Sequence, residues 1–327
     1  MPKSSPDERR PLGKTGPMIS PVALGCWPIA GVTTLDTNEA DSLATIRACF
    51  QLGINHLDTA YVYGPNGESE TLIRRALEGR RDEMVIATKC GIHMEGDQFI
   101  NDGRPETLQR ECEESLRRLG TDRVELLYLH GPDPKVPVEE SAGALRDLQA
   151  AGKTRSIGTS NCTLEQIQAM HSVCPLAAVQ LPYNMLQRDI ERRTIPWCRQ
   201  NGVAVTVYWA LMKGLLTGRL SRQHVFDERD PRRNFPMYQG DEWQKSQEFL
   251  DRLREAAALT GHTVAQLVIN WTVRQPGITA ALCGAKRPWQ IEETAGAMGW
   301  ELTAQQRKLI ESALAARGPA AAKRAFE

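Results

Sequence analysis

The chain has 327 residues, 41% of them hydrophobic, and its 40 Lys and Arg residues balance 40 Asp and Glu residues, so the formal net charge is zero. This length and composition allow one large buried core, and α/β barrels often run past about 250 residues as a single domain. The balanced charge argues against a nucleic acid or a membrane surface as a partner, because both attract proteins through bulk charge.

The cysteines and the N-terminus indicate the compartment. The eight cysteines, at positions 26, 49, 90, 112, 162, 174, 198 and 283, form no C-x-x-C pair. Their wide spacing predicts reduced thiols in a cytoplasmic protein rather than the disulfides of a secreted domain. Residues 1–10 are charged and lack an apolar stretch, and the chain has no run of about 18 apolar residues. We therefore expect neither export nor a membrane span.

In chain order, apolar β-rich runs alternate with longer amphipathic stretches. Residues 12–16 and 19–24 predict a short hairpin that caps the closed end of a barrel. The expected strands end near Gly25, Asp58, Lys89, His130, Ser160, Gln180, Tyr208 and Gly284. Periodicity near 3.6 residues predicts helices over 39–52, 68–77, 105–119, 138–150, 164–171, 190–200, 243–258 and 264–274, and a further helix begins near Pro288.

Eight strands, most followed by a helix, predict an α/β fold of the (β/α)8 TIM-barrel type rather than an open doubly wound sheet. The interval between the seventh and eighth strands is unusually long. Its arginine-rich residues 218–240 predict an extended loop over the barrel mouth, followed by extra helices. We predict a single domain over residues 1–327, with residues 1–10 and 318–327 as candidates for disorder.

Three other kinds of site find little support. Gly13, Lys14 and Thr15 resemble the end of a phosphate-binding loop, but the first glycine of that motif would fall at Glu8. No G-x-G-x-x-G follows a strand, so a Rossmann site is not supported. A metal-dependent hydrolase would need clustered ligands at the strand ends, and only His130 of the six histidines is placed there.

Ionisable residues end three successive strands, and a phenol follows the first. Asp58 ends one strand and Tyr63 lies five residues later, whereas Lys89 and His130 end the next two. Each residue alone is more often structural. In a barrel, however, neighbouring strand ends lie only about 5 Å apart, so we expect these four side chains to meet.

This set suits proton donation to a carbonyl oxygen as the oxygen gains negative charge. An ammonium about 4 Å from a phenol is worth roughly 4 kcal/mol at an effective dielectric of about 20, or about three pKa units before burial opposes it. We therefore expect Lys89 to lower the pKa of Tyr63 and Asp58 to hold the lysine, while His130 orients the carbonyl. The rest of the rate enhancement must come from a reagent bound nearby.

The ordered motifs resemble those of the aldo-keto reductase superfamily, in its bacterial type. The match runs from Leu12 to about Thr294. Besides the Lys89 strand, it takes in LGKTGPMISPVALGCW at 12–27, GINHLDTAYVYG at 53–64, LLYLHGPD at 126–133, IGTSN at 157–161, VQLPYN at 179–184, YWALMKGLLTG at 208–218 and GAKRPWQIEET at 284–294. The resemblance implies an NADP(H)-dependent oxidoreductase that reduces aldehydes or ketones to alcohols by direct hydride transfer, with Tyr63 as the general acid.

The resemblance also implies where the cofactor binds, with NADPH or NADP+ favoured over NADH. Ser160, Asn161 and Gln180 match residues that hydrogen-bond the carboxamide, and Tyr208 matches the aromatic residue on which the nicotinamide stacks. The pyrophosphate would lie in a loop whose backbone amides donate to it. This loop contains Leu211, Gly214 and Leu216, and further cofactor contacts are expected at Gly25, Asp58 and Gly284.

The start of the last helix would hold the adenosine end of the cofactor. Lys286, with Arg287 as second choice, is placed to bind a 2′-phosphate near the helix N-terminus. Gln290, Glu293 and Thr294 would contact the adenine, although many relatives have asparagine where Thr294 stands. Trp209 and Ala210 also depart from the family pattern, which usually has serine and proline there.

Cys26 and Trp27 are expected to line the substrate mouth, where a small carbonyl compound would bind. Two other functions stay open. The chain could be a cofactor-binding regulatory or redox-sensing subunit on the same fold, like the potassium-channel β subunits. It could also be a sugar or polyol dehydrogenase that works in the oxidative direction. The sequence leaves the oligomeric state open.

Overall fold

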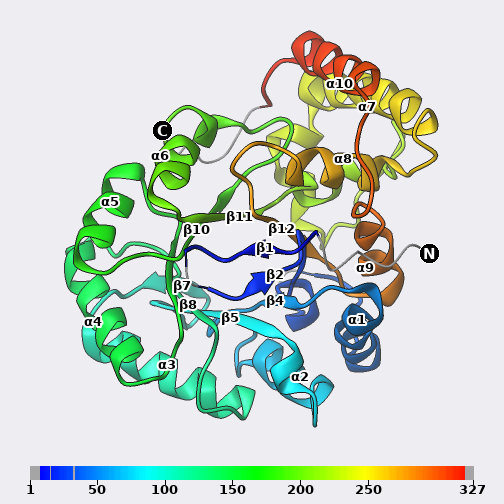
Figure 1. Cartoon of the computed structure of the whole chain (residues 1–327). Helices are drawn as coiled ribbons and strands as arrows, with labels where there is room; N and C mark the ends of the chain where they lie inside the picture. Colours follow the sequence, from blue (N-terminus) through cyan, green and yellow to red (C-terminus); the bar gives the residue numbers. More distant parts are fainter. Residues whose placement is uncertain (1–7, 15, 32–33, 321–327) are drawn as a thin grey trace.

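The computed structural model describes residues 8–14, 16–31 and 34–320, and their longest sheet is a closed parallel barrel (Figure 1). Around the barrel the strands run in the order β10-β11-β12-β3-β4-β5-β8-β9. Their bounds are β3 (Val22–Gly25), β4 (His56–Asp58), β5 (Val85–Cys90), β8 (Leu126–Leu129), β9 (Ile157–Ser160), β10 (Ala178–Pro182), β11 (Ala204–Tyr208) and β12 (Ala280–Gly284). This architecture confirms the predicted TIM barrel.

Helices surround the barrel at the predicted places. They are α1 (Glu39–Leu52), α2 (Glu68–Ala76), α3 (Pro105–Leu119), α4 (Val138–Ala150), α5 (Leu164–Val173), α6 (Thr194–Asn201), α7 (Gly240–Ala258), α8 (Val264–Val273) and α9 (Pro288–Ala295). Helix α6 starts later than predicted, because residues 189–191 form a separate 3-10 turn. The sequence analysis missed α10 (Ala304–Arg317), which packs along α7 (Figure 1).

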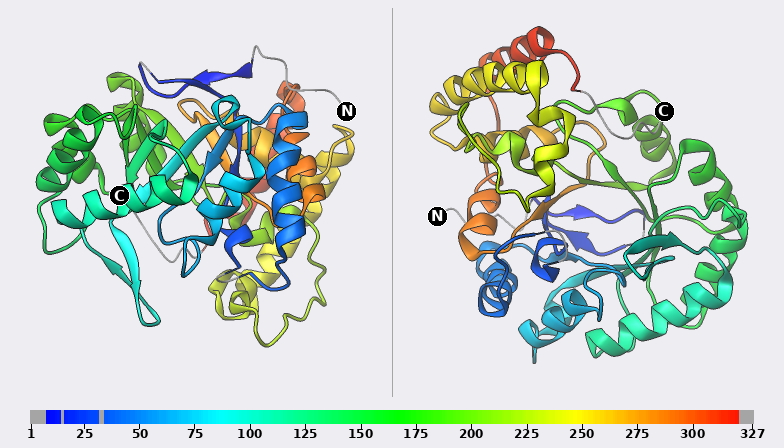
Figure 2. Two further views of the ribbon diagram at one scale, coloured as in Figure 1. Left: turned by 90° about the horizontal axis from the view of Figure 1, so that it is seen from below. Right: turned by 180° about the vertical axis from the view of Figure 1, so that it is seen from behind.

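A hairpin closes one end of the barrel, as predicted, but it is shorter than expected, because residues 22–24 belong to the first barrel strand, β3. Its strands β1 (Arg10–Pro11) and β2 (Met18–Ile19) pair antiparallel. Leu12 and Ile19 are fully buried in one cluster with inward-facing barrel residues, including Tyr128. In the left view of Figure 2 this hairpin lies at one end of the molecule, and the long loops project from the opposite end. The hairpin therefore forms a floor, which leaves the other end for a site.

Two segments project at the open end. The first is an antiparallel hairpin that the sequence analysis missed, β6 (Ile92–Glu95) and β7 (Gln98–Asn101), directly after β5 (Figure 2). The second is the predicted long loop at 218–240, which contains two short 3-10 helices, η6 (Pro231–Asn234) and η7 (Pro236–Tyr238).

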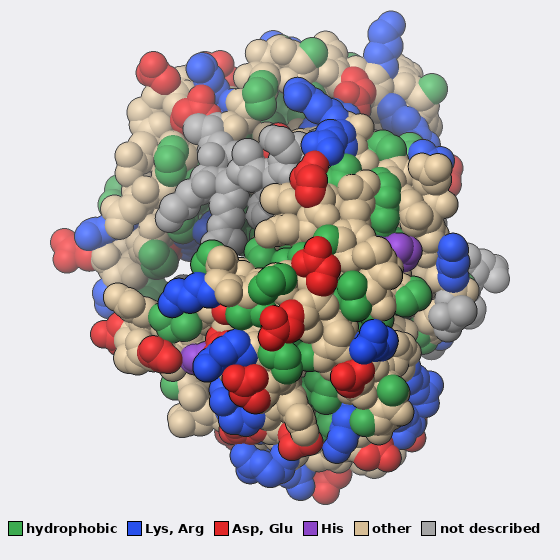
Figure 3. Space-filling view, turned by 90° about the vertical axis from the view of Figure 1, so that its left-hand side faces the viewer, with side chains coloured by type: hydrophobic (Ala, Val, Ile, Leu, Met, Phe, Trp, Pro, Cys, Tyr) green, Lys and Arg blue, Asp and Glu red, His purple; other side chains and the backbone are tan. Residues whose placement is uncertain are grey.

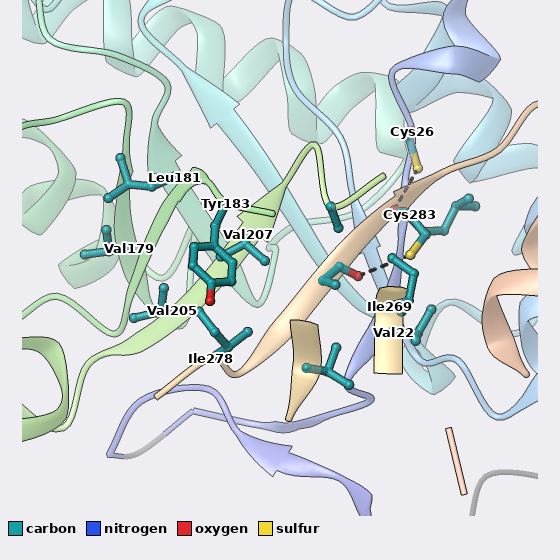
Figure 4. Close-up of a cluster of buried hydrophobic side chains, with 14 of the residues drawn as sticks. Val22, Cys26, Val179, Leu181, Tyr183, Val205, Val207, Ile269, Ile278 and Cys283 are labelled. Carbon is teal, nitrogen blue, oxygen red and sulfur yellow. Dashed lines mark hydrogen bonds between the residues drawn. The ribbon is translucent and has the colours of Figure 1, made fainter. Parts of the chain in front are cut away.

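Side chains of the barrel strands alternate between two environments, as the period of two requires. One set faces the barrel interior, for example Val85 and Ala87 on β5, and the same alternation continues to Lys89. The other set packs against the helices in a larger cluster, part of which Figure 4 shows, with Val22, Val205 and Ile269 among its members. The alternation thus directs the last inward side chain of each strand into the open end.

The chain ends and the surface complete the fold. Arg10 donates to the carbonyl of Val273, and the amide of Ala320 donates to the carbonyl of Leu186. The remaining terminal residues for which disorder was predicted, 1–7 and 321–327, lie outside the described residues. Figure 3 shows acidic and basic side chains interspersed over one face. In the described part of the chain, no helix is both long and apolar enough to cross a membrane.

Candidate active site

Lys89 lies at the centre of the open end, where three acceptors hold its ammonium group. Nζ donates to Asp58 Oδ1 at 2.6 Å, to the Thr59 carbonyl at 2.7 Å and to Tyr63 Oη at 3.4 Å. An ammonium has three protons, so these partners satisfy it. Lys89 and Asp58 are only 1% and 2% exposed. The structure therefore brings the predicted lysine, carboxylate and phenol together as one buried unit.

Backbone hydrogen bonds beyond β4 set the position of Tyr63. The amides of Thr59 and Tyr61 donate to the carbonyls of Ala87 and Lys89 at 2.8 and 3.0 Å, which continues the pairing with β5 past the strand end. The chain then turns at Gly64, whose φ of 97° and close approach to Glu68 leave no room for a side chain. These contacts turn Tyr63 back toward Lys89.

The pKa of Lys89 is shifted as the predicted ion pair requires, whereas the pKa of Tyr63 is shifted in the opposite direction to the prediction. Burial acts to lower the pKa of Lys89, but the Asp58 carboxylate and Tyr63 outweigh it, so the pKa is raised and the ammonium persists. For Tyr63, burial raises the pKa, and the nearby ammonium offsets this only in part. The expectation that Lys89 brings the Tyr63 pKa down to the working range is wrong for this arrangement, because desolvation of the phenolate dominates.

Aromatic side chains bound the space around the Tyr63 ring. His130, whose amide donates to the Cys90 carbonyl at 2.8 Å, presents its ring at 5.8 Å from the Tyr63 ring, centroid to centroid. Trp27 contacts Tyr63 edge to face at 4.9 Å. Phe99, from the β6–β7 hairpin, lies 6.2 Å from Trp27 and is 48% exposed. The mouth beside the phenol is therefore largely aromatic.

The predicted carboxamide residues join the same network. Gln180 donates from Nε2 to Asp58 Oδ2 at 2.7 Å. Asn161 donates to the His130 carbonyl at 2.8 Å and to Ser160 Oγ at 3.1 Å. Tyr208 in turn donates from its hydroxyl to Asn161 Oδ1 at 2.7 Å. These polar side chains come from β9, β10 and β11 and from the residue after β9, so the barrel places them beside Asp58 and His130, two members of the tetrad formed by Asp58, Tyr63, Lys89 and His130.

The predicted pyrophosphate loop has an unusual backbone. Trp209, Met212, Lys213 and Gly214 all have positive φ, and three of the four are not glycine. Such residues cost of order 1 kcal/mol each and persist only where surrounding contacts fix them. Successive amides in such a turn can converge on an anion.

Not every amide of this loop can serve an anion. The Gly214 and Leu216 amides both donate to the Leu211 carbonyl, at 2.9 and 3.1 Å. The turn itself thus uses two of the amides that the resemblance assigns to the pyrophosphate, which argues against that role for them. Leu216 is fully buried and Leu211 partly buried, so their side chains pack against the core.

Side chains from the 218–240 loop brace this turn, and the sequence analysis missed them. Arg232 and Tyr238 donate to the Lys213 carbonyl at 3.4 and 3.1 Å. The Lys213 ammonium lies over the rings of Trp209 and Phe235, at 4.4 and 3.8 Å from their centroids. The available signal was the arginine-rich composition of the segment. It could not show which arginine would reach the turn.

Cations gather where β12 leads into α9. Lys286 donates from Nζ to the Leu35 carbonyl, and Arg287 forms an ion pair with Asp41. Burial lowers the pKa of Lys286; the charges of Arg287 and Arg232 add to this, whereas nearby carboxylates oppose it. Carboxylates accompany these cations, since Asp41 pairs with Arg287 and Asp230 pairs with Arg232.

The remaining predicted adenine residues have structural partners. Gln290 accepts the Lys286 and Arg287 amides at 2.8 and 3.1 Å and so caps α9. Glu293 pairs with Arg219 at 2.9 Å. Thr294 is 5% exposed and its hydroxyl donates to the Gln290 carbonyl of its own helix, which argues against the adenine contact expected there.

Two further predictions concern the first strand. Cys26 is fully buried, with Sγ 3.6 Å from the Leu24 carbonyl, and Figure 4 shows it among core side chains. Its side chain therefore does not line the mouth as expected, whereas that of Trp27 does. Gly25 and Gly284 are register partners at the barrel edge, where a Cβ on Gly284 would press on Pro28 at 3.0 Å. The glycine at 284 therefore leaves room for the Pro28 ring.

Comparison with known proteins identifies the type of barrel. Residues 21–315 match the model of the aldo/keto reductase family. The chain is 35% identical to aldo-keto reductase YhdN of Bacillus subtilis over 306 residues, which cover 93% of this chain and 92% of that protein. It is 31% identical to probable aldo-keto reductase 1 of Glycine max over 305 residues, 92% of this chain and 87% of that one.

Solved structures agree. The glycerol dehydrogenase AKR11B4 from Gluconobacter oxydans superimposes with a TM-score of 0.89 at 34% identity and covers 99% of this chain and 100% of its own. The holo form of aldo-keto reductase AKR11C1 from Bacillus halodurans gives a TM-score of 0.77 at 25% identity, covering 94% and 96%.

Proposed function

The chain belongs to the aldo/keto reductase family of oxidoreductases, and we propose from this that it transfers hydride between NADP(H) and a small carbonyl compound or its alcohol, with Tyr63 as the proton donor. The observation that carries the proposal is the buried Lys89 ammonium, which joins Asp58 Oδ1 to Tyr63 Oη at the open end of the barrel. Members of this family generally use nicotinamide cofactors and act on small carbonyl substrates.

The residues present fit such a cofactor. Asn161 and Gln180 place two carboxamides, and Tyr208 an aromatic ring, beside the tetrad, where other protein groups already orient them. At the far end, Lys286 lies among other cations at the start of α9, whereas Arg287 is already paired with Asp41. Lys286 is therefore the better candidate for a 2′-phosphate, which favours NADPH over NADH. When bound, the nicotinamide supplies the hydride.

The chain's own residues then handle the proton. In reduction, Tyr63 gives its hydroxyl proton to the carbonyl oxygen as negative charge develops there. The resulting phenolate is stabilised by Lys89, 3.4 Å away, whose charge Asp58 maintains. A raised pKa suits this role, because it keeps the phenol protonated until the more basic alkoxide forms. His130 and Trp27 border the space in which the carbonyl would lie.

The direction of the reaction has a second candidate. The similarity to a glycerol dehydrogenase, at a TM-score of 0.89, favours a polyol dehydrogenase that uses the same residues in reverse. Oxidation would require Tyr63 as a phenolate base, and the Lys89 ammonium is the group that stabilises that form.

The test is turnover by the purified full-length chain. We expect NADPH oxidation with 4-nitrobenzaldehyde, NADP+ reduction with glycerol in the polyol case, and a loss of about 100-fold or more in kcat for Tyr63→Phe. NADPH binding, followed by quenching of protein fluorescence, should be unchanged in this variant. Cofactor binding without turnover on any carbonyl or polyol would instead favour a regulatory subunit, and parental turnover by Tyr63→Phe would contradict the proton-donor role.

A further inference from the structure

A polar pocket outside the active site lies between α2, α3 and the loop that joins β4 to α2. Its volume is about 500 Å³, and it opens to solvent, because Pro65, Asn66, Thr71, Arg74 and Arg117 are exposed. The lining residues are Tyr61, Pro65, Asn66, Thr71, Arg74, Glu114, Arg117 and Arg118. None of them belongs to the tetrad or to the residues proposed to bind the cofactor.

Positive charge predominates on the pocket wall. Three guanidinium groups face one carboxylate, that of Glu114, which pairs with Arg118 at 2.8 Å and with Arg117 at 3.3 Å. Arg118 is further balanced by buried Glu70 at 3.4 Å. In the part of the chain that the structure describes, no carboxylate forms an ion pair with Arg74. The pocket thus has more cationic than anionic groups, and anions are its complementary ligands.

One of the arginines is fixed in advance. The Arg118 side chain is 11% exposed, donates from Nη1 to the Tyr61 carbonyl at 3.0 Å, and stacks over the Tyr61 ring at 4.4 Å from its centroid. Arg118 therefore forms a fixed part of the pocket wall, beside the more exposed Arg117. Asn66 and Thr71 add an amide and a hydroxyl to the same wall. Arginine forks and such donors together suit the oxygens of a phosphate.

The pocket wall includes residues of the loop from Tyr61 to Gly67, which also contains Tyr63. Tyr61 lies two residues before Tyr63, and its amide donates to the Lys89 carbonyl at 3.0 Å. Behind Arg118, Glu70 accepts from the hydroxyl of Thr88, the neighbour of Lys89, at 2.7 Å. A ligand that contacts Asn66 beside the fixed Arg118 would therefore restrict the loop from Tyr61 to Gly67.

We propose that this pocket binds a phosphorylated small molecule, whose phosphate contacts Arg74 and Arg117 and whose binding steadies residues 61–67. A free phosphate would fill only a small part of about 500 Å³, and the polar walls at Tyr61 and Glu114 suit a hydroxylated body such as a sugar. The proposal concerns binding and does not depend on the reaction proposed above.

Calorimetric titration of the full chain tests the site, with glucose 6-phosphate, inorganic phosphate and glucose as probes. We expect glucose 6-phosphate to bind, glucose not to bind, and the double variant Arg74→Gln/Arg117→Gln to weaken binding at least tenfold. Arg75→Gln is the matched control, because Arg75 lies on the same helix but pairs with Glu39 outside the pocket. It should bind as the parent does.

A second variant and a second measurement separate this site from the cofactor site. Lys286→Ala should leave glucose 6-phosphate binding unchanged; a loss of binding there would place the ligand at the cofactor site and overturn the proposal. Equal affinities for phosphate and glucose 6-phosphate would overturn the assignment of an organic phosphate. Hydrogen exchange over residues 61–67 should slow with glucose 6-phosphate in the parent and not in the double variant. If hydrogen exchange over residues 61–67 did not change in the parent protein saturated with glucose 6-phosphate, the proposed restriction of this loop would be refuted.

Discussion

The side-chain amide of Gln180 donates to Oδ2 of Asp58 at 2.7 Å, while Lys89 occupies Oδ1 of the same carboxylate. A carboxylate only accepts hydrogen bonds, so the amide nitrogen must face Asp58 and the amide oxygen must point elsewhere. Asp58 thus orients a proposed cofactor contact and a proposed catalytic lysine at once. Its substitution should affect both functions, whereas that of Tyr63 should affect only proton transfer.

The buried ion pair gives a stability prediction. Lys89→Met leaves the 2% exposed Asp58 carboxylate without its cation, and we expect a loss of about 3–5 kcal/mol in the free energy of unfolding, measured with urea. The double variant Lys89→Met/Asp58→Asn should recover part of that loss, because no unpaired charge is then buried. A double variant that is less stable than the parent by the sum of the losses in Lys89→Met and Asp58→Asn would contradict this account of the pair.

The raised pKa of Tyr63 predicts the pH dependence of the two directions. Reduction needs the protonated phenol, so a pKa above the ordinary value near 10 should keep the reductive rate from falling through loss of this proton up to about pH 9. Oxidation needs the phenolate, so its kcat/KM should rise with pH across the same range. A reductive rate that falls with a midpoint near pH 7, in a pH dependence that Tyr63→Phe abolishes, would contradict this prediction. It would show that cofactor binding lowers the pKa of Tyr63 instead.

Cofactor preference should depend on one lysine. In Lys286→Ala we expect the Kd for NADPH to rise at least tenfold, or about 1.4 kcal/mol, with that for NADH unchanged, because only NADPH has the 2′-phosphate. Thr294→Val is the control, since its hydroxyl serves its own helix, and it should bind NADPH as the parent does. Equal NADPH affinity in Lys286→Ala and the parent would remove the role of this lysine.

The mouth beside Tyr63 should respond to Phe99. This ring is 48% exposed and lies 6.2 Å from Trp27, so Phe99→Ala removes a wall of the mouth without disturbing the core. We expect a higher KM for aromatic aldehydes and a kcat close to that of the parent. The comparison of 4-nitrobenzaldehyde with a small aliphatic aldehyde provides the control. An equal rise in KM for both substrates would point to a general disturbance of the hairpin.

Substitutions in the barrel floor should lower the stability of the protein and leave its catalytic rate unchanged. Leu12 is fully buried among the inward side chains of the closed end, in a cluster that includes Ile19, Val85 and Ala87. Leu12→Ala should lower the free energy of unfolding by about 2–5 kcal/mol in urea titrations. At temperatures where the variant stays folded, its kcat should match that of the parent. A selective loss of kcat would mean that the floor also shapes the open end.

The sequence alone was enough to predict the barrel fold. It was also enough to predict that the side chains of Asp58, Tyr63, Lys89 and His130 lie close together. Both follow from short-range patterns, because strand periodicity determines which side chains face inward, and the end of each strand fixes the edge at which they emerge. The β6–β7 hairpin had a local signal too, since Gly96 and Asp97 separate two short runs, and it was overlooked.

The tertiary structure decided which groups were already engaged. Gln290 caps a helix, Thr294 bonds within α9, and Cys26 packs in the core, although each lies in a motif that indicated a ligand contact. Burial likewise decided the direction of the Tyr63 pKa against the charge of Lys89. A motif fixes the residue and its place along the chain, whereas rotamers, desolvation and partners such as Arg232 for Lys213 arise from segments that meet only in the folded chain.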